Sequence, residues 1–344
     1  MNSMDKRRSV NGRPQRIAVV GAGITGLAAA RTLHDHGQDV QVFDKGRGVG
    51  GRTSVRRQAP FEFDHGAQYF TARAERFSAQ VTDWREAGVV ATWSGRIGSL
   101  ERGMWRDSSP QERYVGVPGM NAIAKYLAAG LNVTTETRVA KLTWDGQAWR
   151  LSSDGGAALG LFDAAIVAVP APQATDLLAG QTALVEQAAR CAMSPCWAVM
   201  LGFESALPIP YDGVFVSGSP LSWMARNSSK PGRSSGEAWV LHAGPEWSAA
   251  HIDDHPELVI AALNAELERA LGGEERSPAH AAAHRWRYAM PAEPLRVGAL
   301  WDADSRLAVC GDWCQGARIE GAFLSGWAAA DRVLRASGGP ADFA

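Results

Sequence analysis

The sequence lacks the features of membrane proteins and of nucleic-acid-binding proteins. It contains no apolar run of the roughly 18 residues that a membrane-spanning helix needs. Its 35 Lys and Arg residues are balanced by 36 Asp and Glu residues, whereas a broad nucleic-acid-binding surface needs a basic excess. The first 14 residues are polar and contain no apolar stretch of a secretory signal. We therefore expect a cytoplasmic protein with a flexible tail over residues 1–14 and no membrane or nucleic-acid partner.

Cysteine and lysine are also scarce. The four Cys residues do not form the C-x-x-C spacing of zinc and thioredoxin sites, and the eight His residues show no metal-type pairing. This predicts free thiols in a reducing compartment and no metal site. Only five Lys residues are present. Lys230 follows two serines and precedes Pro-Gly, a composition typical of a surface loop.

A strand–helix–strand pattern opens the chain. The apolar run at 16–20 predicts a buried parallel strand, the Ala- and Leu-rich residues 24–37 predict a helix, and the alternating residues 39–43 predict a second strand. Such a sequence of elements is a βαβ unit. The length of 344 residues suggests about two domains, and this unit marks the first of them as an α/β domain.

A G-x-G-x-x-G motif lies between the first strand and the helix. Gly21 permits the tight turn, Gly23 lets the backbone approach a pyrophosphate, and Gly26 allows the helix to pack closely on the strand. The helix N-terminus adds amide donors and a favourable dipole. Asp44 lies 18 positions past Gly26, where it can accept the hydroxyls of an adenosine ribose. These features together predict dinucleotide binding.

Further motifs favour FAD over NAD. A second glycine-rich loop at 46–52 ends in Arg52, which can pair with a pyrophosphate. Near the C-terminus, Asp312 follows a short apolar run and can bond the ribityl chain. A last helix opens around 320–322, so its N-terminal amides can face the flavin N1–C2=O edge, where negative charge accumulates on reduction. A nicotinamide dehydrogenase has no obvious use for a second glycine-rich, arginine-bearing loop after Asp44.

The whole set of motifs resembles the FAD-dependent amine-oxidase superfamily. Three further stretches make the chain similar to the bacterial members of the renalase family: Phe-Asp-His-Gly-Ala-Gln-Tyr-Phe-Thr at 63–71, Trp-Met-Ala-Arg-Asn-Ser-Ser-Lys-Pro-Gly-Arg at 223–233, and Cys-Gly-Asp-Trp-Cys at 310–314. The resemblance covers nearly the whole chain apart from the N-terminal tail. It implies an α/β fold, with a Rossmann-like FAD-binding domain of the amine-oxidase and p-hydroxybenzoate-hydroxylase type and an inserted mixed-sheet substrate domain.

Both implied domains combine separate segments. We expect a discontinuous FAD-binding domain over 15–75, 117–185 and 296–344, and a substrate (cap) domain over 76–116 and 186–295. Eight of the 13 Trp residues fall in the substrate segments: Trp84, Trp93, Trp105, Trp197, Trp223, Trp239, Trp247 and Trp286. Because tryptophan is large and flat, this excess fits a cap that binds a flat ring.

The resemblance also implies an activity. Renalase-like proteins bind FAD without a covalent link and oxidise isomeric dihydronicotinamides, the 2- and 6-dihydro forms of NAD(P). A hydride passes to flavin N5, NAD(P)+ leaves, and O2 reoxidises the flavin to give hydrogen peroxide. Hydride transfer from an activated dihydropyridine needs two stacked rings rather than a strong acid or base. We therefore expect no acid–base catalytic residue.

The motifs and the resemblance together specify the candidate site residues. The cofactor-binding candidates are Gly21, Gly23, Ile24, Thr25, Gly26, Asp44, Lys45, Arg47, Gly51, Arg52, Gly66, Ala67, Val139, Gly311, Asp312, Glu320, Gly321 and Ala322. The substrate-binding candidates are Ala67, Gln68, Tyr69, Phe70, Trp223, Arg226, Asn227, His242, Trp286 and Tyr288. The aromatic members are expected to form walls, and the polar members to contact the carboxamide, ribose or phosphate of the substrate.

Two alternatives stay open. The first is a flavin amine oxidase or desaturase that acts on another substrate. Amine oxidases usually keep a lysine hydrogen-bonded through water to flavin N5, and the surface loop expected around Lys230 counts against that reading. The second is a non-catalytic, FAD-binding redox sensor. The expected partners are a small-molecule dinucleotide substrate and O2, and the sequence leaves the oligomeric state open.

Overall fold

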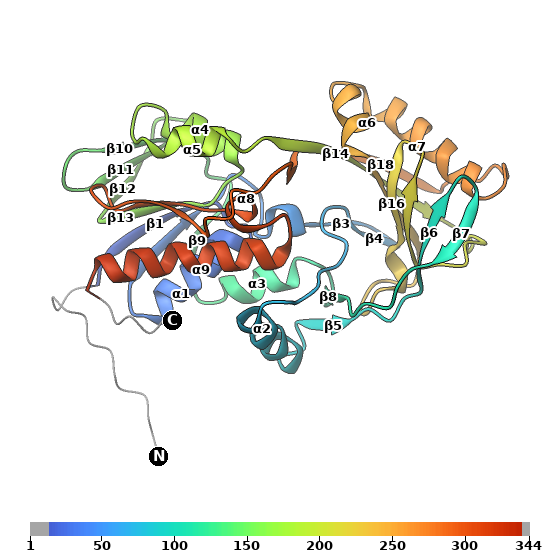
Figure 1. Ribbon diagram of the computed structural model, residues 1–344, viewed down its shortest axis with the longest axis horizontal. Coiled ribbons are helices and arrows are strands. Elements are labelled where there is room, and N and C mark those ends of the chain that lie inside the picture. The colour runs from blue at the N-terminus through green and yellow to red at the C-terminus, as the bar shows by residue number, and fades with distance from the viewer. Residues whose placement is uncertain (1–13, 339–344) are drawn as a thin grey trace, which may run out of the picture. The chain divides into compact units, whose positions relative to one another are not determined.

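The computed structural model describes residues 14–338, and Figure 1 shows their helices and strands. Of the predicted tail over residues 1–14, only Pro14 falls within the described part. The chain divides into two compact units, each assembled from separate stretches. The first unit holds the described residues up to Gly51, Ala124–Met193 and those from Pro291 onward, and the second holds Arg52–Ile123 and Ser194–Met290.

Six strands form the central sheet of the first unit, in the order β19-β20-β13-β1-β2-β9. Neighbouring strands are parallel, except that β19 runs antiparallel to β20. The strands are β1 (Arg16–Val20), β2 (Asp39–Phe43), β9 (Asn132–Thr134), β13 (Ala164–Val167), β19 (Leu300–Asp302) and β20 (Leu307–Val309). The apolar residues of β1 are almost fully buried, as expected for a parallel strand covered on both faces. This sheet confirms the predicted Rossmann-like α/β fold.

Helix α1 (Ile24–Asp35) connects β1 to β2, as predicted, although it ends at Asp35 because Gly37 adopts a left-handed φ of 79°. Helix α9 (Ile319–Ala336) packs along α1 (Figure 1). The two helices approach closely at Gly326, where a Cβ would lie 2.0 Å from the carbonyl O of Thr25. The other helices of this unit are α3 (Ala122–Ala128), α4 (Ala171–Leu178), α5 (Leu184–Ala189) and α8 (Asp312–Gln315).

A separate three-stranded antiparallel sheet adds to the first unit. Its strands are β10 (Val139–Trp144), β11 (Trp149–Ser153) and β12 (Ala158–Phe162). Trp149 is fully buried and its indole N–H donates to the carbonyl O of Ser305 at 2.6 Å. This bond ties the small sheet to the segment between β19 and β20.

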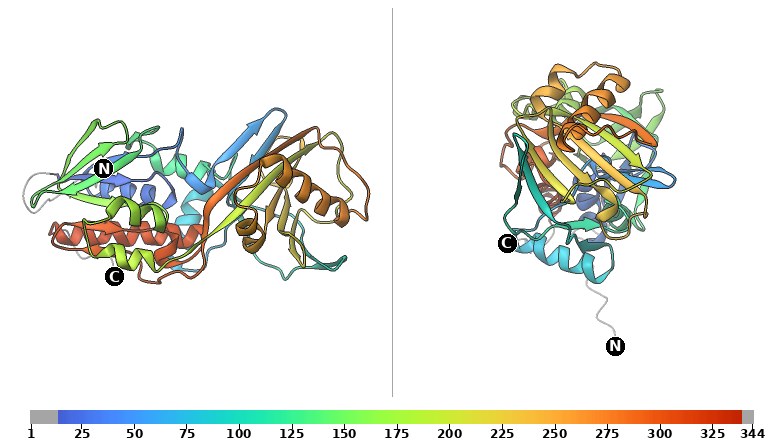
Figure 2. Two further views of the ribbon diagram at one scale, coloured as in Figure 1. Left: turned by 90° about the horizontal axis from the view of Figure 1, so that it is seen from above. Right: turned by 90° about the vertical axis from the view of Figure 1, so that its right-hand side faces the viewer.

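The second unit is built on a seven-stranded sheet in the order β18-β14-β17-β16-β15-β6-β7. The strands are β6 (Ile97–Glu101), β7 (Met104–Asp107), β14 (Met193–Phe203), β15 (Gly213–Ser217), β16 (Leu221–Arg226), β17 (Glu237–Ala243) and β18 (His280–Pro291). Strand β15 pairs in parallel with β6 and antiparallel with β16, so the sheet is mixed, as predicted. Helix α7 (Pro256–Ala270) lies against it through Val259, Leu263 and Leu267, four residues apart (Figure 2).

Two short antiparallel strand pairs also belong to the second unit. Strands β3 (Val55–Gln58) and β4 (Phe61–Asp64) pair, as do β5 (Val90–Thr92) and β8 (Tyr114–Gly116). Phe61 and Phe63 of β4 pack against Met200 and Val240 of the large sheet. This packing places residues 52–75 in the second unit, although they are expected in the FAD-binding domain. Which segments bind FAD therefore stays a prediction.

The remaining elements of the second unit are α2 (Glu75–Glu86), α6 (Pro245–Ala250) and two 3-10 turns, η1 (Gly51–Thr53) at its boundary and η2 (Asn227–Ser229). Within residues 14–338, no helix has both the length and the apolar character needed to cross a lipid bilayer.

Candidate functional site

The three glycines of the first motif have different surroundings in the structure. Gly21 has a φ of 107°, and a Cβ there would lie 2.5 Å from the carbonyl O of Ala168. A Cβ on Gly26 would lie 1.9 Å from the carbonyl O of Gly21, so only glycine lets α1 pack on this turn. A Cβ on Gly23 would meet no protein atom within 4 Å. Gly21 and Gly26 thus serve the fold, whereas Gly23 faces space that the protein does not fill.

Asp44 joins the two glycine-rich loops. Its carboxylate accepts the backbone N–H of Ala22 at 2.6 Å and that of Gly46 at 2.7 Å. The N–H of Gly50 in turn donates to the carbonyl O of Ala22 at 2.8 Å. Each carboxylate oxygen keeps a lone pair, and Asp44 is partly exposed at the end of β2. The carboxylate therefore has capacity left for ribose hydroxyls.

The first unit also holds the other early cofactor candidates. Ile24 and Thr25 are buried in the first turn of α1, Lys45 and Arg47 are exposed, Gly51 follows them at the end of the loop, and Val139 is buried at the start of β10. Within the described part of the chain, no side chain caps α1. Its first amides therefore lack the side-chain acceptor that usually satisfies such groups.

The C-terminal candidates lie at the starts of two helices. Gly311 and Asp312 begin α8, while Glu320, Gly321 and Ala322 lie in the first turn of α9. A Cβ on Gly321 would lie 2.1 Å from the carbonyl O of Gly316, so glycine is required there. Arg52, Gly66 and Ala67 lie instead in the second unit, where the N–H of Ala67 donates to the carbonyl O of Arg52 at 2.9 Å.

These residues fit a dinucleotide. The uncapped N-terminus of α1 supplies amide donors and a positive dipole end for a pyrophosphate. Gly23 leaves room for it, and Asp44 supplies acceptors for a ribose. FAD would be held in the first unit by these three features, and the contributions of the remaining candidates stay predictions.

The substrate-binding candidates fall into separate groups within the second unit. Tyr69 and Trp223 lie together, with ring centroids 5.5 Å apart, and Trp93 lies 6.2 Å from Tyr69. We refer to these three residues as the aromatic cluster. Phe215 packs edge-on against Trp223 at 4.8 Å. The predicted association of Tyr69 and Trp223 is therefore present in the geometry, although their role towards substrate stays a prediction.

His242 and Trp286 meet at His65, which the sequence reasoning did not single out. Trp286 donates its indole N–H to the carbonyl O of His65 at 2.9 Å, and the His242 Nε2 lies 3.3 Å from the same oxygen. The His65 ring stacks on Trp286 at 5.2 Å and meets His284 edge-on at 4.9 Å. Burial lowers the pKa of both His65 and His242 to about 4, so both rings are neutral at physiological pH.

Because of these two histidines, we expect the second unit to lose stability at acidic pH. Because their folded pKa of about 4 lies below the usual 6.5, the unfolded chain binds protons more readily between these values. The unfolding free energy should therefore fall as the pH is lowered through this window, by about 2 kcal/mol for each histidine on reaching about pH 5. Thermal unfolding as a function of pH measures this loss.

Replacing His65 tests the assignment. The His65→Phe variant keeps a ring to stack on Trp286 but cannot titrate, so its unfolding free energy should fall less steeply than that of the wild type between neutral pH and pH 5. His34 is exposed on α1, and His34→Gln serves as the matched control with an unchanged pH profile. If the unfolding free energy of His65→Phe falls with pH as steeply as that of the wild type, the pKa of His65 is not lowered in the folded protein.

Lys230 is not at the surface, contrary to the sequence-based expectation. Its side chain is 0% exposed, and its ammonium group donates to Asn227 Oδ1 at 2.9 Å, Gln68 Oε1 at 3.1 Å and Asp64 Oδ2 at 3.3 Å. Burial lowers the pKa of Lys230 to about 8, although the charge of Asp64 opposes the shift. The loop is buried because distant residues surround it, a fact that its Ser-Ser-Lys-Pro-Gly composition does not reveal.

Asp64 is the centre of this buried cluster. It accepts Arg233 Nε at 3.1 Å, a second guanidinium nitrogen of Arg233 at 2.7 Å and the N–H of Met120 at 3.0 Å. Burial alone would raise the pKa of Asp64, but the charges of Lys230 and Arg233 hold it below its usual value. One carboxylate thus faces two cations, and the cluster carries a net charge of about +1 at neutral pH.

The cluster also holds two substrate-binding candidates. Gln68 is buried, donates its amide to the carbonyl oxygens of Asp64 and Gly66, and accepts from Lys230. Asn227 is fully buried and donates to the carbonyl O of Glu62 at 2.8 Å. Both side chains are thus engaged with protein groups.

The other candidates lie apart from these groups. Phe70 is 3% exposed and packs against Phe77 and Tyr114 in the interior. Tyr288 is partly buried on β18, and Ala67 is partly buried beside Gly66. Their predicted contacts with substrate remain to be tested.

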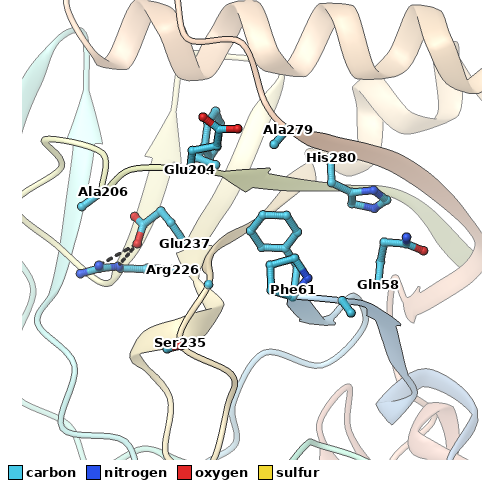
Figure 3. A pocket seen from close by; sticks show the side chains of 13 residues that line it. Gln58, Phe61, Glu204, Ala206, Arg226, Ser235, Glu237, Ala279 and His280 are labelled. Carbon is cyan, nitrogen blue, oxygen red and sulfur yellow. Dashed lines mark hydrogen bonds and ion pairs between the residues drawn. The ribbon is translucent and has the colours of Figure 1, made fainter.

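Arg226 lines a cavity of about 640 Å³ in the second unit (Figure 3). Its guanidinium group points towards Glu237 and pairs with it at 2.6 Å. Phe61, Glu204 and His280 also line this cavity, and none of the other substrate-binding candidates does. Arg226 and the aromatic cluster therefore do not line the same cavity.

Two sequence families match the chain. Residues 89–334, more than half of the chain, match the family described as flavin containing amine oxidoreductase. Residues 19–84 match the NAD(P)-binding Rossmann-like domain.

Similar solved structures share the fold. Cyclohexylamine oxidase from Brevibacterium oxydans IH-35A has a TM-score of 0.74 and 14% identity, covering 94% of this chain and 99% of that chain. Wild-type putrescine oxidase bound to putrescine has a TM-score of 0.71 and 15% identity, with the same coverage. At such identities the likeness shows the fold alone.

One protein relative matches only a short stretch. The 4,4'-diapophytoene desaturase (4,4'-diaponeurosporene-forming) of Staphylococcus aureus strain Newman is 47% identical over 51 residues, which is 15% of this chain. The match spans 10% of the length of that relative.

Proposed function

The chain belongs to the family of flavin containing amine oxidoreductases and is an FAD-dependent oxidoreductase, and from this premise we propose that it oxidises isomeric dihydronicotinamides, as members of the renalase family do. The proposed substrates are the 2- and 6-dihydro forms of NAD(P). Bound FAD would supply the redox chemistry, namely hydride acceptance at N5 and electron transfer to O2, with NAD(P)+ and hydrogen peroxide as products. The proposal includes a cytoplasmic location.

The charge around the aromatic cluster carries this proposal. The Lys230 ammonium lies 5.6 Å from the ring centroid of Trp93, and the Arg113 guanidinium lies 5.3 Å from that of Tyr69. Asp64 is the carboxylate that pairs with Lys230, and it also pairs with Arg233. A net positive surrounding repels a protonated amine and attracts a dinucleotide that carries phosphates. The cluster itself offers flat rings against which a dihydropyridine can pack.

Lys230 supports a second candidate, amine oxidation, only in part. It is buried with a lowered pKa, as a lysine that acts on a flavin through water would be. However, its three N–H groups already have three protein acceptors, from Asp64, Gln68 and Asn227. An ammonium group has three donors, so none is left for a water molecule. Its geometry is that of a residue that positions Gln68.

The cysteines support FAD binding without a covalent link. The thiolate is the nucleophilic form of cysteine. Burial raises the pKa of Cys310 and Cys314, so both stay protonated at neutral pH. All four cysteines of the chain are free in the structure.

Anaerobic mixing of the holoenzyme with single substrates tests the proposal. We expect 6-dihydro-NAD to bleach the oxidised flavin spectrum and to yield NAD+, because its hydride is activated and its phosphates match the positive surrounding. Ordinary NADH is the matched control, since it differs only in the position of the hydride, and should react far more slowly.

Putrescine separates the two candidates. If putrescine bleaches the flavin and 6-dihydro-NAD does not, amine oxidation replaces the proposal. The Lys230→Met variant sharpens the comparison, because it should retain the reaction with 6-dihydro-NAD, slowed through the position of Gln68 and through the loss of one positive charge near the aromatic cluster. Bleaching by none of the compounds favours a redox sensor.

A further inference from the structure

Arg113 is a buried cation that forms no ion pair within the described residues. The residue is 6% exposed, and one of its terminal nitrogens donates to the carbonyl O of Gln111 at 3.1 Å. Its Nε–H is buried and has no acceptor among the described residues. The guanidinium group lies over the ring of Tyr69 at 5.3 Å. A buried charge without an ionic partner is costly, and an anionic ligand removes much of that cost.

A second unsatisfied donor belongs to Trp223, whose ring packs against the same tyrosine. Trp223 is 7% exposed, its centroid lies 5.5 Å from that of Tyr69, and its indole N–H has no acceptor in the part of the chain that the structure describes. Buried indole N–H groups usually find a partner. Arg113 and Trp223 thus each carry an unused donor, and both side chains lie beside the partly exposed ring of Tyr69.

Another buried guanidinium group among the described residues, that of Arg233, has an acceptor for each of its three nitrogens. The side chain of Arg233 is 1% exposed and bonds to Asp64 through two nitrogens and to the carbonyl oxygens of Gly116 and Pro231 at 2.7 Å each. Arg113 differs because it is held by one carbonyl and one ring. Lys230 cannot serve an anion in its place, since its three donors are engaged.

We propose that Arg113 and Trp223 form an anion-binding site that recognises the phosphate of a dihydronicotinamide nucleotide. Arg113 binds the phosphate group next to the nicotinamide ribose, and Trp223 donates to an acceptor oxygen of the same ligand. The inference rests on the proposed function and adds a specificity determinant to it. Arginine suits this role because its planar donors match phosphate oxygens in pairs.

Two substrates that differ by one phosphate test the site. The holoenzyme is reduced anaerobically with 6-dihydronicotinamide mononucleotide and with the phosphate-free 6-dihydronicotinamide riboside. We expect the wild type to prefer the mononucleotide by about 10- to 100-fold in kcat/KM, the effect of one or two charge-assisted hydrogen bonds. The Arg113→Met variant should lose this preference while still oxidising the riboside. Arg106 is exposed on β7, and Arg106→Met is the matched control with the preference intact.

Equilibrium binding separates this inference from the proposed function. Oxidised nicotinamide mononucleotide and nicotinamide riboside are titrated against the holoenzyme, with the flavin spectrum as readout. If neither dihydro compound reduces the flavin, the proposed function fails, and tighter binding of the mononucleotide that is lost in Arg113→Met still supports the anion site. Equal binding of the two ligands by the wild type, or a preference that survives in Arg113→Met, overturns it.

Two measurements keep the test decisive if Arg113→Met does not fold. Raising the ionic strength should reduce the wild-type preference for the mononucleotide and leave riboside binding unchanged, because salt screens the phosphate contact. The Arg113→Lys variant keeps the charge but not the paired donors, so it should show an intermediate preference. A preference that is insensitive to salt and unchanged in Arg113→Lys contradicts the site.

Discussion

Replacing Asp64 by asparagine is expected to lower the unfolding free energy by about 3–5 kcal/mol, the cost of leaving buried charges without their partner. Asparagine has nearly the same shape, so no cavity is formed and the change is one of charge. It leaves Lys230 and Arg233, whose side chains are 0% and 1% exposed, without a carboxylate. Urea unfolding followed by tryptophan fluorescence measures the loss.

Removing a cation from the same cluster should destabilise the protein less than removing the charge of Asp64. Lys230→Met removes one of two cations, and Arg233 still pairs with Asp64 through two nitrogens. The remaining cost is that of the oxygens of Gln68 and Asn227, which lose their donor, or about 1–3 kcal/mol. A larger loss of unfolding free energy in Asp64→Asn than in Lys230→Met would therefore indicate that the cluster carries a net positive charge.

The pH dependence identifies the cause of the Asp64→Asn effect. The folded pKa of Lys230, about 8, lies below its usual 10.5, so the unfolded chain binds more protons between these values and stability rises with pH there. Without Asp64 the pKa falls further and this rise starts at lower pH. The difference between variant and wild type should thus shrink by about 1 kcal/mol between about pH 7 and pH 9. A loss of packing alone would not depend on pH.

Asp107 provides the matched control. It pairs with Arg96 at 2.9 Å, but the two side chains are 72% and 58% exposed. Exposed ion pairs contribute about 0–1 kcal/mol, so Asp107→Asn should change stability little. If Asp64→Asn costs no more than Asp107→Asn, the buried cluster is not charged in the way described.

Adding one methyl group at Gly23 or at Gly26 should weaken FAD binding in both cases but destabilise the fold only at Gly26. In Gly26→Ala the new Cβ would lie only 1.9 Å from the carbonyl O of Gly21, far inside van der Waals contact. Helix α1 must therefore shift away from the turn. We expect this variant to be destabilised by about 3 kcal/mol or more and to be purified without FAD. Thermal unfolding and the flavin-to-protein absorbance ratio measure both effects.

Gly23→Ala should leave the fold intact and weaken only the binding of FAD. The residue has φ −75° and ψ 178°, which alanine adopts readily, and its Cβ meets no protein atom within 4 Å. The methyl group instead occupies space predicted for the pyrophosphate, so the FAD affinity should fall about tenfold or more. Titration of the apoprotein with FAD gives the affinity. A Gly23→Ala protein that retains FAD as tightly as the wild type would show that the pyrophosphate lies elsewhere.

The local features of the fold were predictable from sequence because their physical causes are local. The run at 16–20, the glycine spacing and Asp44 all lie within one βαβ unit, where period and turn chemistry decide the structure. The buried state of Lys230 depends instead on Asp64 and Gln68, more than 160 positions away. Nothing in the residues around Lys230 indicates those partners.

The candidate site shows the same limit. Tyr69 and Trp223, two of the expected walls, lie together, but Arg226 lines a cavity that neither of them lines. The sequence reasoning also did not single out His65, which binds Trp286 through its carbonyl O. A signal for His65 existed, since it lies inside the stretch 63–71. Arg113 gave no signal, because an arginine becomes informative only when its burial and its lack of an acid are known.

The order of the two units along the chain has a consequence for synthesis. The second unit is complete once Met290 has been made, whereas the first unit still lacks everything from Pro291 onward. The missing part includes β19 and β20 at one edge of the central sheet, and α9, which packs on α1. Because domains fold as their residues emerge from the ribosome, the second unit can form first. The N-terminal βαβ unit then keeps part of its apolar surface exposed until α9 has been synthesised and packs on α1.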